Sequence, residues 1–381
     1  MSRTLRPALI VAGLLIPASA SAQADTYTRI TVSATEMYDG NLLAAPAASG
    51  PQADFVTRLG PAFDAGYLSR SLDVVARYGV EAERYRSHPG LSSAVARQDA
   101  RLTLRYVPRP RLTLNADASY LSTRMPSELN LDSQLSAGRA PAARTAMISS
   151  LNYKLGGATG GIAEYTLGRD AIEGGITTTS HQWRAGLERR AGVRNTYRAD
   201  YSGRRIGFVG VVPYTSHVIT ATWVHRVTPR TTLELTAGPR VSGQGVRPEV
   251  ATRVRRQLAR GEWSAGYSRS EVTAIGEPGP IDVQRVGLSA RYRPVRRISL
   301  TATPAATRST RGDRHVPVYS LDVESAIDAS RGLTVVAWAR AGRQHGTLNG
   351  PPATIPYQQV GVKLMISLPR SGAGTAGRVA P

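Results

Sequence analysis

The 381-residue sequence predicts an all-β fold, a single transmembrane antiparallel up-and-down β-barrel of about 18 strands with short periplasmic turns and long extracellular loops. Three observations predict it. Runs of about ten residues alternate apolar and polar side chains along the chain. Their connections alternate between tight turns built on Pro or Gly and longer polar stretches. No apolar run of about 18 residues, as a membrane helix needs, follows the N-terminus.

The first residues have the features of a secretory signal peptide. Arg3 and Arg6 precede a short apolar stretch over 8–16, and small residues over 20–24 offer a cleavage site after Ala22 or Ala24. We therefore predict a signal peptide over 1–24, the barrel over 25–369 and a flexible C-terminal tail over 370–381. Export would place the mature chain in the outer membrane of a Gram-negative bacterium, with both barrel termini on the short-turn side.

Composition narrows the alternatives. The chain has no cysteine, which excludes disulfide scaffolds and thiolate metal sites. Apolar residues are spread along the whole chain, so it is not disordered. A sandwich or propeller would favour large core residues, yet Phe55, Phe63 and Phe208 are the only phenylalanines. A parallel β-helix would show a shorter repeat.

The clearest alternation lies between Arg111 and Tyr120. Apolar residues from Leu112 to Tyr120 occupy every second position and predict a lipid-facing side, while the positions between them are polar. Tyrosines near both strand ends predict two interfacial girdles. Those expected beside short turns are Tyr67, Tyr106, Tyr153, Tyr197 and Tyr292, and those beside long loops are Tyr85, Tyr120, Tyr214 and Tyr357. Pro61 and Pro304 lack a ladder donor, so we expect a bulge or irregular pairing there.

Several segments resemble the β-barrel porin 2 family, outer-membrane barrels found near exopolysaccharide and exosortase gene sets. The similar residues are Met37-Tyr38-Asp39-Gly40-Asn41, Ala53-Asp54-Phe55-Val56-Thr57, Gly60-Pro61, Tyr106-Val107-Pro108-Arg109, Leu112-Thr113-Leu114 and Met125-Pro126-Ser127-Glu128-Leu129-Asn130. They cover about the first third of the mature chain. The resemblance implies an outer-membrane barrel linked to polysaccharide export, with other export components as partners and no shared catalytic motif.

The polar face of the strands is rich in arginine, in a chain whose formal net charge is +21 and whose only lysines are Lys154 and Lys363. Guanidinium groups stay charged and bind carboxylate or phosphate in a bidentate manner. A barrel of this size leaves an aqueous channel, so such a lining would favour anions. Acids on the same face would pair with some of these arginines. The predicted pore-lining residues are Arg77, Arg101, Arg105, Arg184, Arg285 and Arg291.

Other functions have weaker support. Nucleic-acid binding is disfavoured because the arginines are distributed through strands and turns without a basic helix or a known module. His181, His217 or His315 with an acid would suit a rim enzyme, but no nucleophile elbow, metalloprotease helix or phosphate loop accompanies them. No cofactor or metal site is predicted. Arg311-Gly312-Asp313 spells an adhesion tripeptide, yet it is also ordinary loop chemistry.

The sequence therefore predicts a porin-like channel in outer-membrane lipid, for anionic or sugar-like solutes or linked to exopolysaccharide export. Two alternatives remain. One is a non-conducting structural or assembly component of a surface-polysaccharide apparatus, and the other is a barrel enzyme with its site at the extracellular rim.

Overall fold

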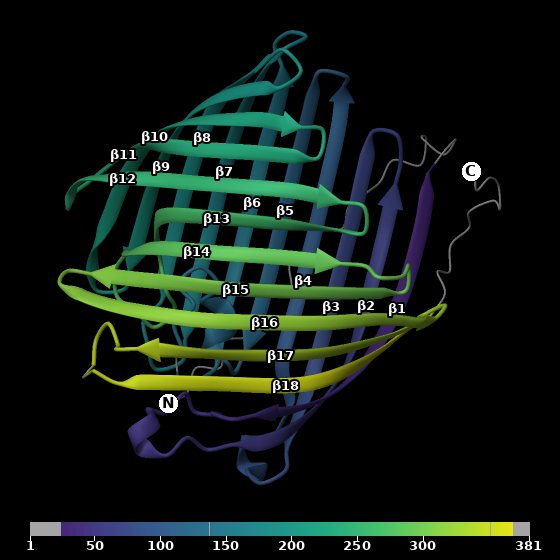
Figure 1. The fold of residues 1–381 in the computed structure, drawn as a ribbon, viewed down its shortest axis with the longest axis vertical. Helices are drawn as coiled ribbons and strands as arrows, with labels where there is room; N and C mark the ends of the chain where they lie inside the picture. The colour runs from purple at the N-terminus through teal and green to yellow at the C-terminus, as the bar shows by residue number, and fades with distance from the viewer. Residues whose placement is uncertain (1–23, 137, 351, 369–381) are drawn as a thin grey trace.

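The computed structural model describes residues 24–136, 138–350 and 352–368, and it is a closed, 18-stranded antiparallel barrel (Figure 1). The predicted fold class is thus confirmed. The predicted signal peptide and C-terminal tail lie outside the described residues, except for Ala24. Three short 3-10 helices are also present in the described part, and none of its helices is long and apolar enough to cross a membrane.

The strands follow one another around the wall in chain order, so that in Figure 1 the green and yellow later strands cross in front of the blue early ones. Their bounds are β1 Asp25–Asp39, β2 Asp54–Leu68, β3 Leu72–Tyr85, β4 Ser93–Arg109, β5 Leu112–Thr123, β6 Ala142–Lys154, β7 Thr159–Ile172, β8 Thr178–Ala191, β9 Asn195–Phe208, β10 Val211–Thr228, β11 Thr231–Ser242, β12 Gly245–Leu258, β13 Gly261–Val272, β14 Ile281–Tyr292, β15 Ile298–Arg311, β16 Arg314–Ser330, β17 Leu333–His345 and β18 Thr354–Ser367. The 3-10 helices are η1 Ala47–Ser49, η2 Pro89–Leu91 and η3 Pro126–Leu129.

Pairing of the first strand with the last closes the barrel. β1 pairs with β18 from Thr31 opposite Ser367 to Asp39 opposite Gln359, and with β2 along its whole length. Closure leaves no open sheet edge, which is what a strand protein needs in lipid because every backbone group must be paired.

The predicted alternation decides which face of each strand points inward. In β5, Leu114 stands opposite Tyr106 and Leu151 on the outward face, whereas Thr113 stands opposite Asn152 on the inward face. Exposed Ile, Leu, Val, Phe and Tyr side chains cover the outward face on most strands. An arrangement with large apolar residues outside and polar residues inside suits a wall placed between lipid and water.

Only part of the predicted girdles matches this register. The five tyrosines expected beside short turns face outward, but beside the other rim only Tyr120 does. Tyr85, Tyr214 and Tyr357 face inward because each lies one residue out of phase with the apolar run of its strand. Outward aromatic residues nearer that rim are instead Tyr38, Phe55, Trp183, Tyr267 and Tyr319.

Three polar stretches that the sequence predicts as long loops, 204–214, 239–248 and 308–316, are mostly strand. β9 and β10 are joined by residues 209–210, β11 and β12 by 243–244, and β15 and β16 by 312–313. Gly210 and Gly312 adopt positive φ in two of these turns, so the hairpins close tightly and the strands extend past the region expected for them. Long connections remain at residues 40–53, 124–141, 273–280 and 346–353.

The two prolines interrupt pairing without a register shift, so the expected irregularity is present but no bulge forms. Pairing of β2 with β3 skips Gly60 and Pro61 between Leu59 and Ala62. Pairing of β14 with β15 skips the position of Pro304, which still stands opposite Leu321 of β16. Each proline therefore keeps one neighbouring strand.

Lipid exposure of the outward face is testable by arginine substitution in β5. Ala118→Arg should destabilise the barrel by about 2–4 kcal/mol, because Ala118 lies near the middle of β5 on the outward face, opposite Leu102 and Met147, where the guanidinium meets hydrocarbon. Thr113→Arg, on the inward face, should be close to neutral. The measurement is reversible urea unfolding in lipid vesicles. Equal free energies of unfolding for the two variants would contradict the assignment of faces.

Candidate functional site: the narrowed mouth of the barrel

The interior differs between the two ends of the barrel. Toward the short-turn end the inward-facing Arg77, Arg101 and Arg105 have side chains 50%, 64% and 55% exposed. Toward the long-loop end, inward-facing Val56 and Val316 are 0% exposed. Inward side chains are thus exposed to solvent toward the short-turn end and buried toward the long-loop end. We call the covered end the mouth.

One long connection covers much of the mouth. Residues 124–141, between β5 and β6, contain η3 and are called the inward segment here because they contact the inner wall on opposite sides. At one side Glu128 and Arg139 meet side chains of β2, β3 and β4. At the other side Gln134 accepts hydrogen bonds from Thr307 of β15 and Ser320 of β16.

A network of charges holds one end of the inward segment. Glu83 accepts from Arg139 at 2.6 Å and pairs with Arg58 at 2.7 Å, and Tyr85 donates to the same carboxylate at 2.8 Å. Glu128 lies 3.5 Å from both Arg58 and Arg97. Because the Glu83 and Arg139 side chains are nearly buried, these contacts are screened far less than surface ion pairs.

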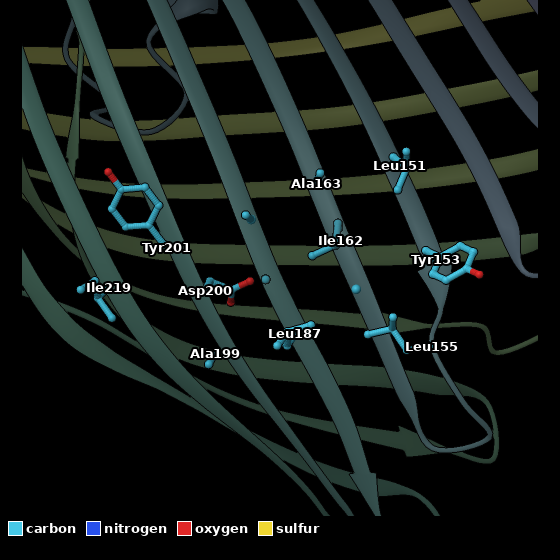
Figure 2. A pocket seen from close by; sticks show the side chains of 13 residues that line it. Leu151, Tyr153, Leu155, Ile162, Ala163, Leu187, Ala199, Asp200, Tyr201 and Ile219 are labelled. Carbon is cyan, nitrogen blue, oxygen red and sulfur yellow. The ribbon is translucent and has the colours of Figure 1, made fainter.

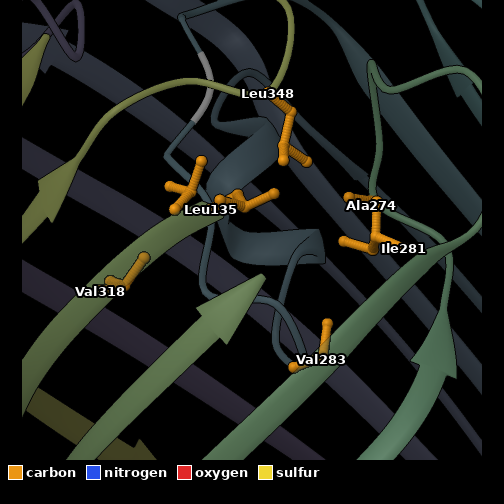
Figure 3. Close-up of a cluster of buried hydrophobic side chains, with 7 residues drawn as sticks. Leu135, Ala274, Ile281, Val283, Val318 and Leu348 are labelled. Atoms are coloured by element: carbon orange, nitrogen blue, oxygen red, sulfur yellow. The ribbon is translucent and has the colours of Figure 1, made fainter. Parts of the chain in front are cut away.

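An apolar cluster holds the opposite end (Figure 3). Leu135 packs there against side chains from β14, β16 and the two connections after β13 and β17. The cluster consists of Leu135, Ala274, Ile281, Val283, Val316, Val318 and Leu348. The Ser136 amide also donates to the Gln344 side chain of β17 at 2.8 Å. The inward segment is therefore anchored by burial as well as by hydrogen bonds.

The connection between β13 and β14 folds over the mouth beside the inward segment. The Ile275 amide donates to the Asn130 side chain at 2.8 Å, which ties the two together. At its base, Arg240 is 2% exposed and meets Glu249 at 2.9 Å, Asp282 at 3.4 Å and Glu271 at 3.5 Å. Burial raises the pKa of the Glu277 carboxyl in this connection, while nearby Arg311 acts to lower it.

Guanidinium groups at the mouth have spare hydrogen-bond donors. Among the described residues, Arg58 Nε, Arg97 Nε and Arg139 Nη1 are buried and meet no acceptor with hydrogen-bond geometry, although Arg97 Nε lies 3.5 Å from Glu128. Arg58, Arg97, Arg139 and Lys363 surround three carboxylates here, those of Glu81, Glu83 and Glu128, which leaves one positive charge in surplus. Water or an anionic solute is the natural acceptor.

All six predicted pore-lining arginines lie on inward positions of the register. Four of the six form ion pairs with aspartates. The pairs are Arg77 with Asp99 at 3.6 Å, Arg101 with Asp117 at 2.8 Å, Arg105 with Asp73 at 3.2 Å and Arg184 with Asp200 at 2.9 Å. Arg285 donates to the Leu131 carbonyl of the inward segment at 3.1 Å, and Arg291 stands opposite Glu262. The structure thus brings Arg285 to the mouth and leaves the others along the wall.

The histidines do not assemble a site with a carboxylate, apart from His88, which contacts Asp54 at 2.9 Å at the rim. His181 contacts the Tyr165 hydroxyl, His217 the Tyr201 hydroxyl and His315 the Thr310 hydroxyl. In the described ranges, no group of three or more His, Asp or Glu side chains has the geometry to hold a metal ion.

A hollow of about 610 Å³ lies on the outward face of β6 to β10 (Figure 2). It arises where small residues meet across strands, as Ala163 does opposite Ala185, with Ala199 on the next strand. Leu151, Leu187 and Ile219 line its sides. This hollow is separate from the mouth, because Leu151, Leu187, Tyr201 and Ile219 belong to the opposite face of the wall and the hollow lies toward the short turns.

Sequence reasoning missed the residues that build the mouth, including Arg58, Glu83, Arg139 and Arg240. Their partners are distant in the chain, so alternation alone does not pair them. One signal was available. Leu129, Leu131 and Leu135 are apolar residues in a stretch that is otherwise polar, and buried Leu129 and Leu135 show that such residues mark a loop that folds inward.

No protein-family model matches the chain, and no curated protein matches it either. Among solved structures, the chain is similar to Pseudomonas aeruginosa OpdO, with a TM-score of 0.51, 11% identity, and 92% of this chain and 98% of that chain covered. It is also similar to Pseudomonas aeruginosa OccK5 (OpdH), with a TM-score of 0.50, 10% identity, and 90% and 98% covered. The chain therefore has the fold of an outer-membrane β-barrel.

Proposed function

We propose that the protein is an outer-membrane channel that passes small anionic solutes through a mouth narrowed by the inward segment. The observation that supports this most is the solvated arginine lining below the mouth, where Arg77, Arg101 and Arg105 are at least half exposed on the inward face. A side chain that faces the interior and is exposed to this extent borders water. Arginines in such a space raise the local concentration of anions.

The pairing pattern sets the expected strength of that preference. Aspartates neutralise part of the lining, so the field comes from the surplus of guanidinium groups and from the spare donors of Arg58 and Arg139 at the mouth. Bidentate donors suit carboxylate or phosphate groups. Small anionic solutes, including acidic sugars, match both the charge and the restricted opening.

The chain's placement in the outer membrane belongs to the same proposal. The outward apolar belt requires lipid as a partner, and the resemblance to the β-barrel porin 2 family supports a link to exopolysaccharide export. In that case other export components would be partners. The predicted signal peptide would direct the chain to the envelope.

The inward segment also favours a second candidate, a non-conducting component of a surface-polysaccharide apparatus. Its anchors on opposite sides of the wall, Glu128 and Leu135, would suit a plugged mouth. Conductance in a planar bilayer separates the two candidates. A rim enzyme has less support, because His181, His217 and His315 face hydroxyl groups and not carboxylates in the structure.

Ion selectivity tests the channel. We expect reversal potentials to show selectivity for chloride over potassium in low salt. This selectivity should decrease as salt shortens the Debye length from about 30 Å at 0.01 M to about 10 Å at 0.1 M. Arg101→Gln with Arg105→Gln should weaken or reverse the preference, because Asp117 and Asp73 lose their partners.

The matched control is Arg189→Gln with Arg256→Gln, which removes two outward arginines and should leave selectivity unchanged. Heat-modifiable mobility on gels confirms that each variant is folded. A potassium preference in the wild type would contradict the anion channel. Absence of conductance in a folded, inserted barrel would favour the non-conducting component.

A further inference from the structure

The outward face of β7 to β10 carries basic side chains near the long-loop rim. Arg169, His181, Arg205 and His217 all occupy outward positions of the register, and both arginines are exposed. His181 stands directly opposite Arg205, so the four side chains form one patch across neighbouring strands. We call it the outer basic patch. A charged group on this face lowers the stability of the barrel when it lies at the membrane midplane, but it has little effect near the interface.

The patch is built from a repeat of 36 residues. Ala163-Glu164-Tyr165-Thr166 and Arg169 in β7 recur as Ala199-Asp200-Tyr201-Ser202 and Arg205 in β9. Thr179-Ser180-His181 in β8 recurs as Thr215-Ser216-His217 in β10. Each copy therefore supplies one outward tyrosine, histidine and arginine, and the two copies meet where His181 faces Arg205.

Hydrogen bonds orient both histidines in the same way. The Tyr165 hydroxyl lies 2.7 Å from His181 Nδ1, and the Tyr201 hydroxyl lies 2.8 Å from His217 Nδ1. When the tyrosine donates to Nδ1, the neutral imidazole carries its proton on Nε2 and offers a second donor. Each pair thus leaves a donor beside the exposed guanidinium groups.

The outer basic patch is not neutralised by the protein. Glu164, Asp170 and Asp200 of the same strands face inward, and the two aspartates pair there with Arg144 and Arg184. The outward cross-strand neighbours of Arg169 and Arg205 are Thr145, Thr179, His181 and Thr215. Within the described chain, neither guanidinium forms an ion pair. An anion from outside the protein is the missing counter-charge.

The apolar hollow of Figure 2 lies below this patch on the same strands. Tyr201 belongs to both, since it contacts His217 and lines the hollow. Arg205 lies four positions farther along β9, about 13 Å from Tyr201. The hollow is an open groove lined almost entirely by carbon, and it extends from Tyr201 toward Tyr153 near the short turns, so its upper part can accept the end of a hydrocarbon chain. Basic donors above an apolar groove match a molecule with a phosphate head and a hydrocarbon chain.

We propose that this part of the outer wall binds a phosphorylated lipid of the outer leaflet, with the phosphate on Arg169 and Arg205 and an acyl chain in the hollow. On β8, the strand between them, Arg169 is level with Thr179 and Arg205 is level with His181. The two arginines are therefore two strands and two residues apart, about 12 Å, so their long side chains can reach one phosphate group from either side. This inference rests on the outer-membrane placement in the proposed function, but it does not depend on conduction.

The test uses the folded barrel in mixed micelles containing bisphosphorylated lipid A, with native mass spectrometry after detergent exchange. Wild type should retain the lipid. Arg169→Gln with Arg205→Gln should retain about tenfold less, because two charge-assisted contacts are lost. The matched control Arg189→Gln with Arg256→Gln removes outward arginines at the other rim and should behave as wild type.

A second variant tests the hollow. Ala185→Leu should lower retention by filling it, whereas Ala337→Leu, at an outward alanine of β17 far from the hollow, should not. Equal retention by wild type and the double arginine variant would overturn the proposal, as would equal retention of lipid A without its phosphates. Inorganic phosphate that binds as tightly as the lipid would overturn a lipid as the occupant. Conductance of the double arginine variant should equal that of wild type. The lipid proposal and the channel proposal can therefore fail independently.

Discussion

Deleting residues 131–136 should raise single-channel conductance several-fold. These residues carry the contacts of the inward segment with the far wall, namely Leu135 in the apolar cluster, Gln134 with β15 and β16, and the Leu131 carbonyl with Arg285. Without them the segment is held by Glu128 and Arg139 near β2 to β4 and by Leu129 and Asn130, which contact Ile275. The opening beside β14 to β17 is then free, and the released Arg285 faces water.

Planar-bilayer recordings measure this effect. The control deletion removes residues 47–50, an exposed part of another long connection that contains η1. That control should keep the wild-type conductance, because no contact with the inward segment is lost. Unchanged conductance in the 131–136 deletion, with the folded mobility retained, would show that the inward segment does not restrict the path.

The strand number, the closed topology and the inward or outward sense of most side chains were predictable from the sequence. A period of two fixes which side of a strand each residue takes, and Arg111 to Tyr120 keeps that period without error. The six predicted arginines lie on inward positions for this reason. Local chemistry was also sufficient for short turns such as the one after Tyr106.

The pairing of charges and the path of the inward segment were not predictable. Arg184 and Asp200 meet because strand register places Asp200 opposite Gly186, two residues from Arg184 on the neighbouring strand. Glu83 meets Arg139 across 56 residues of sequence. Alternation gives the face of a residue but not its neighbour on the next strand. Leu129 and Leu135 indicate that the loop folds inward, but they do not indicate where it packs, since the buried surface that holds Leu135 comes from four distant segments.

The outer basic patch could not be predicted from the sequence for a different reason. Its repeat is visible in the sequence, because Tyr165 and Tyr201, Arg169 and Arg205, and His181 and His217 are each 36 residues apart. Taken one by one, these residues are ordinary loop or rim residues. The repeat gains meaning only once β7 to β10 are known to be adjacent, which places His181 opposite Arg205 on the lipid side.

Replacing Arg240 should cause the largest loss of stability on the inward face. Its guanidinium is almost fully buried and meets Glu249, Glu271 and Asp282, which Arg240→Gln would leave close together with less positive charge. Arg204, Arg247 and Arg269 still contact Glu249 or Asp282, but Glu271 keeps only hydroxyl partners, Tyr214 and Ser216. Leaving a buried charge without its partner costs about 3–5 kcal/mol.

Urea unfolding in lipid vesicles gives the free energy, and Arg340→Gln is the matched control. Arg340 is also an inward arginine, but it is 55% exposed and pairs with a single exposed aspartate, Asp322, at 3.4 Å. Its loss should cost no more than about 1 kcal/mol. Similar losses for the two variants would mean that the Arg240 cluster is solvated like an ordinary surface pair.

A double variant separates the charge effect from a simple packing defect. Arg240→Gln with Glu271→Gln removes the stranded carboxylate along with the guanidinium, so it should be more stable than Arg240→Gln alone. Protease cleavage within residues 273–280 should follow the same order, because these contacts hold the base of that connection over the mouth. If the double variant is less stable than either single variant, Arg240 acts through the shape of its side chain and not through its charge.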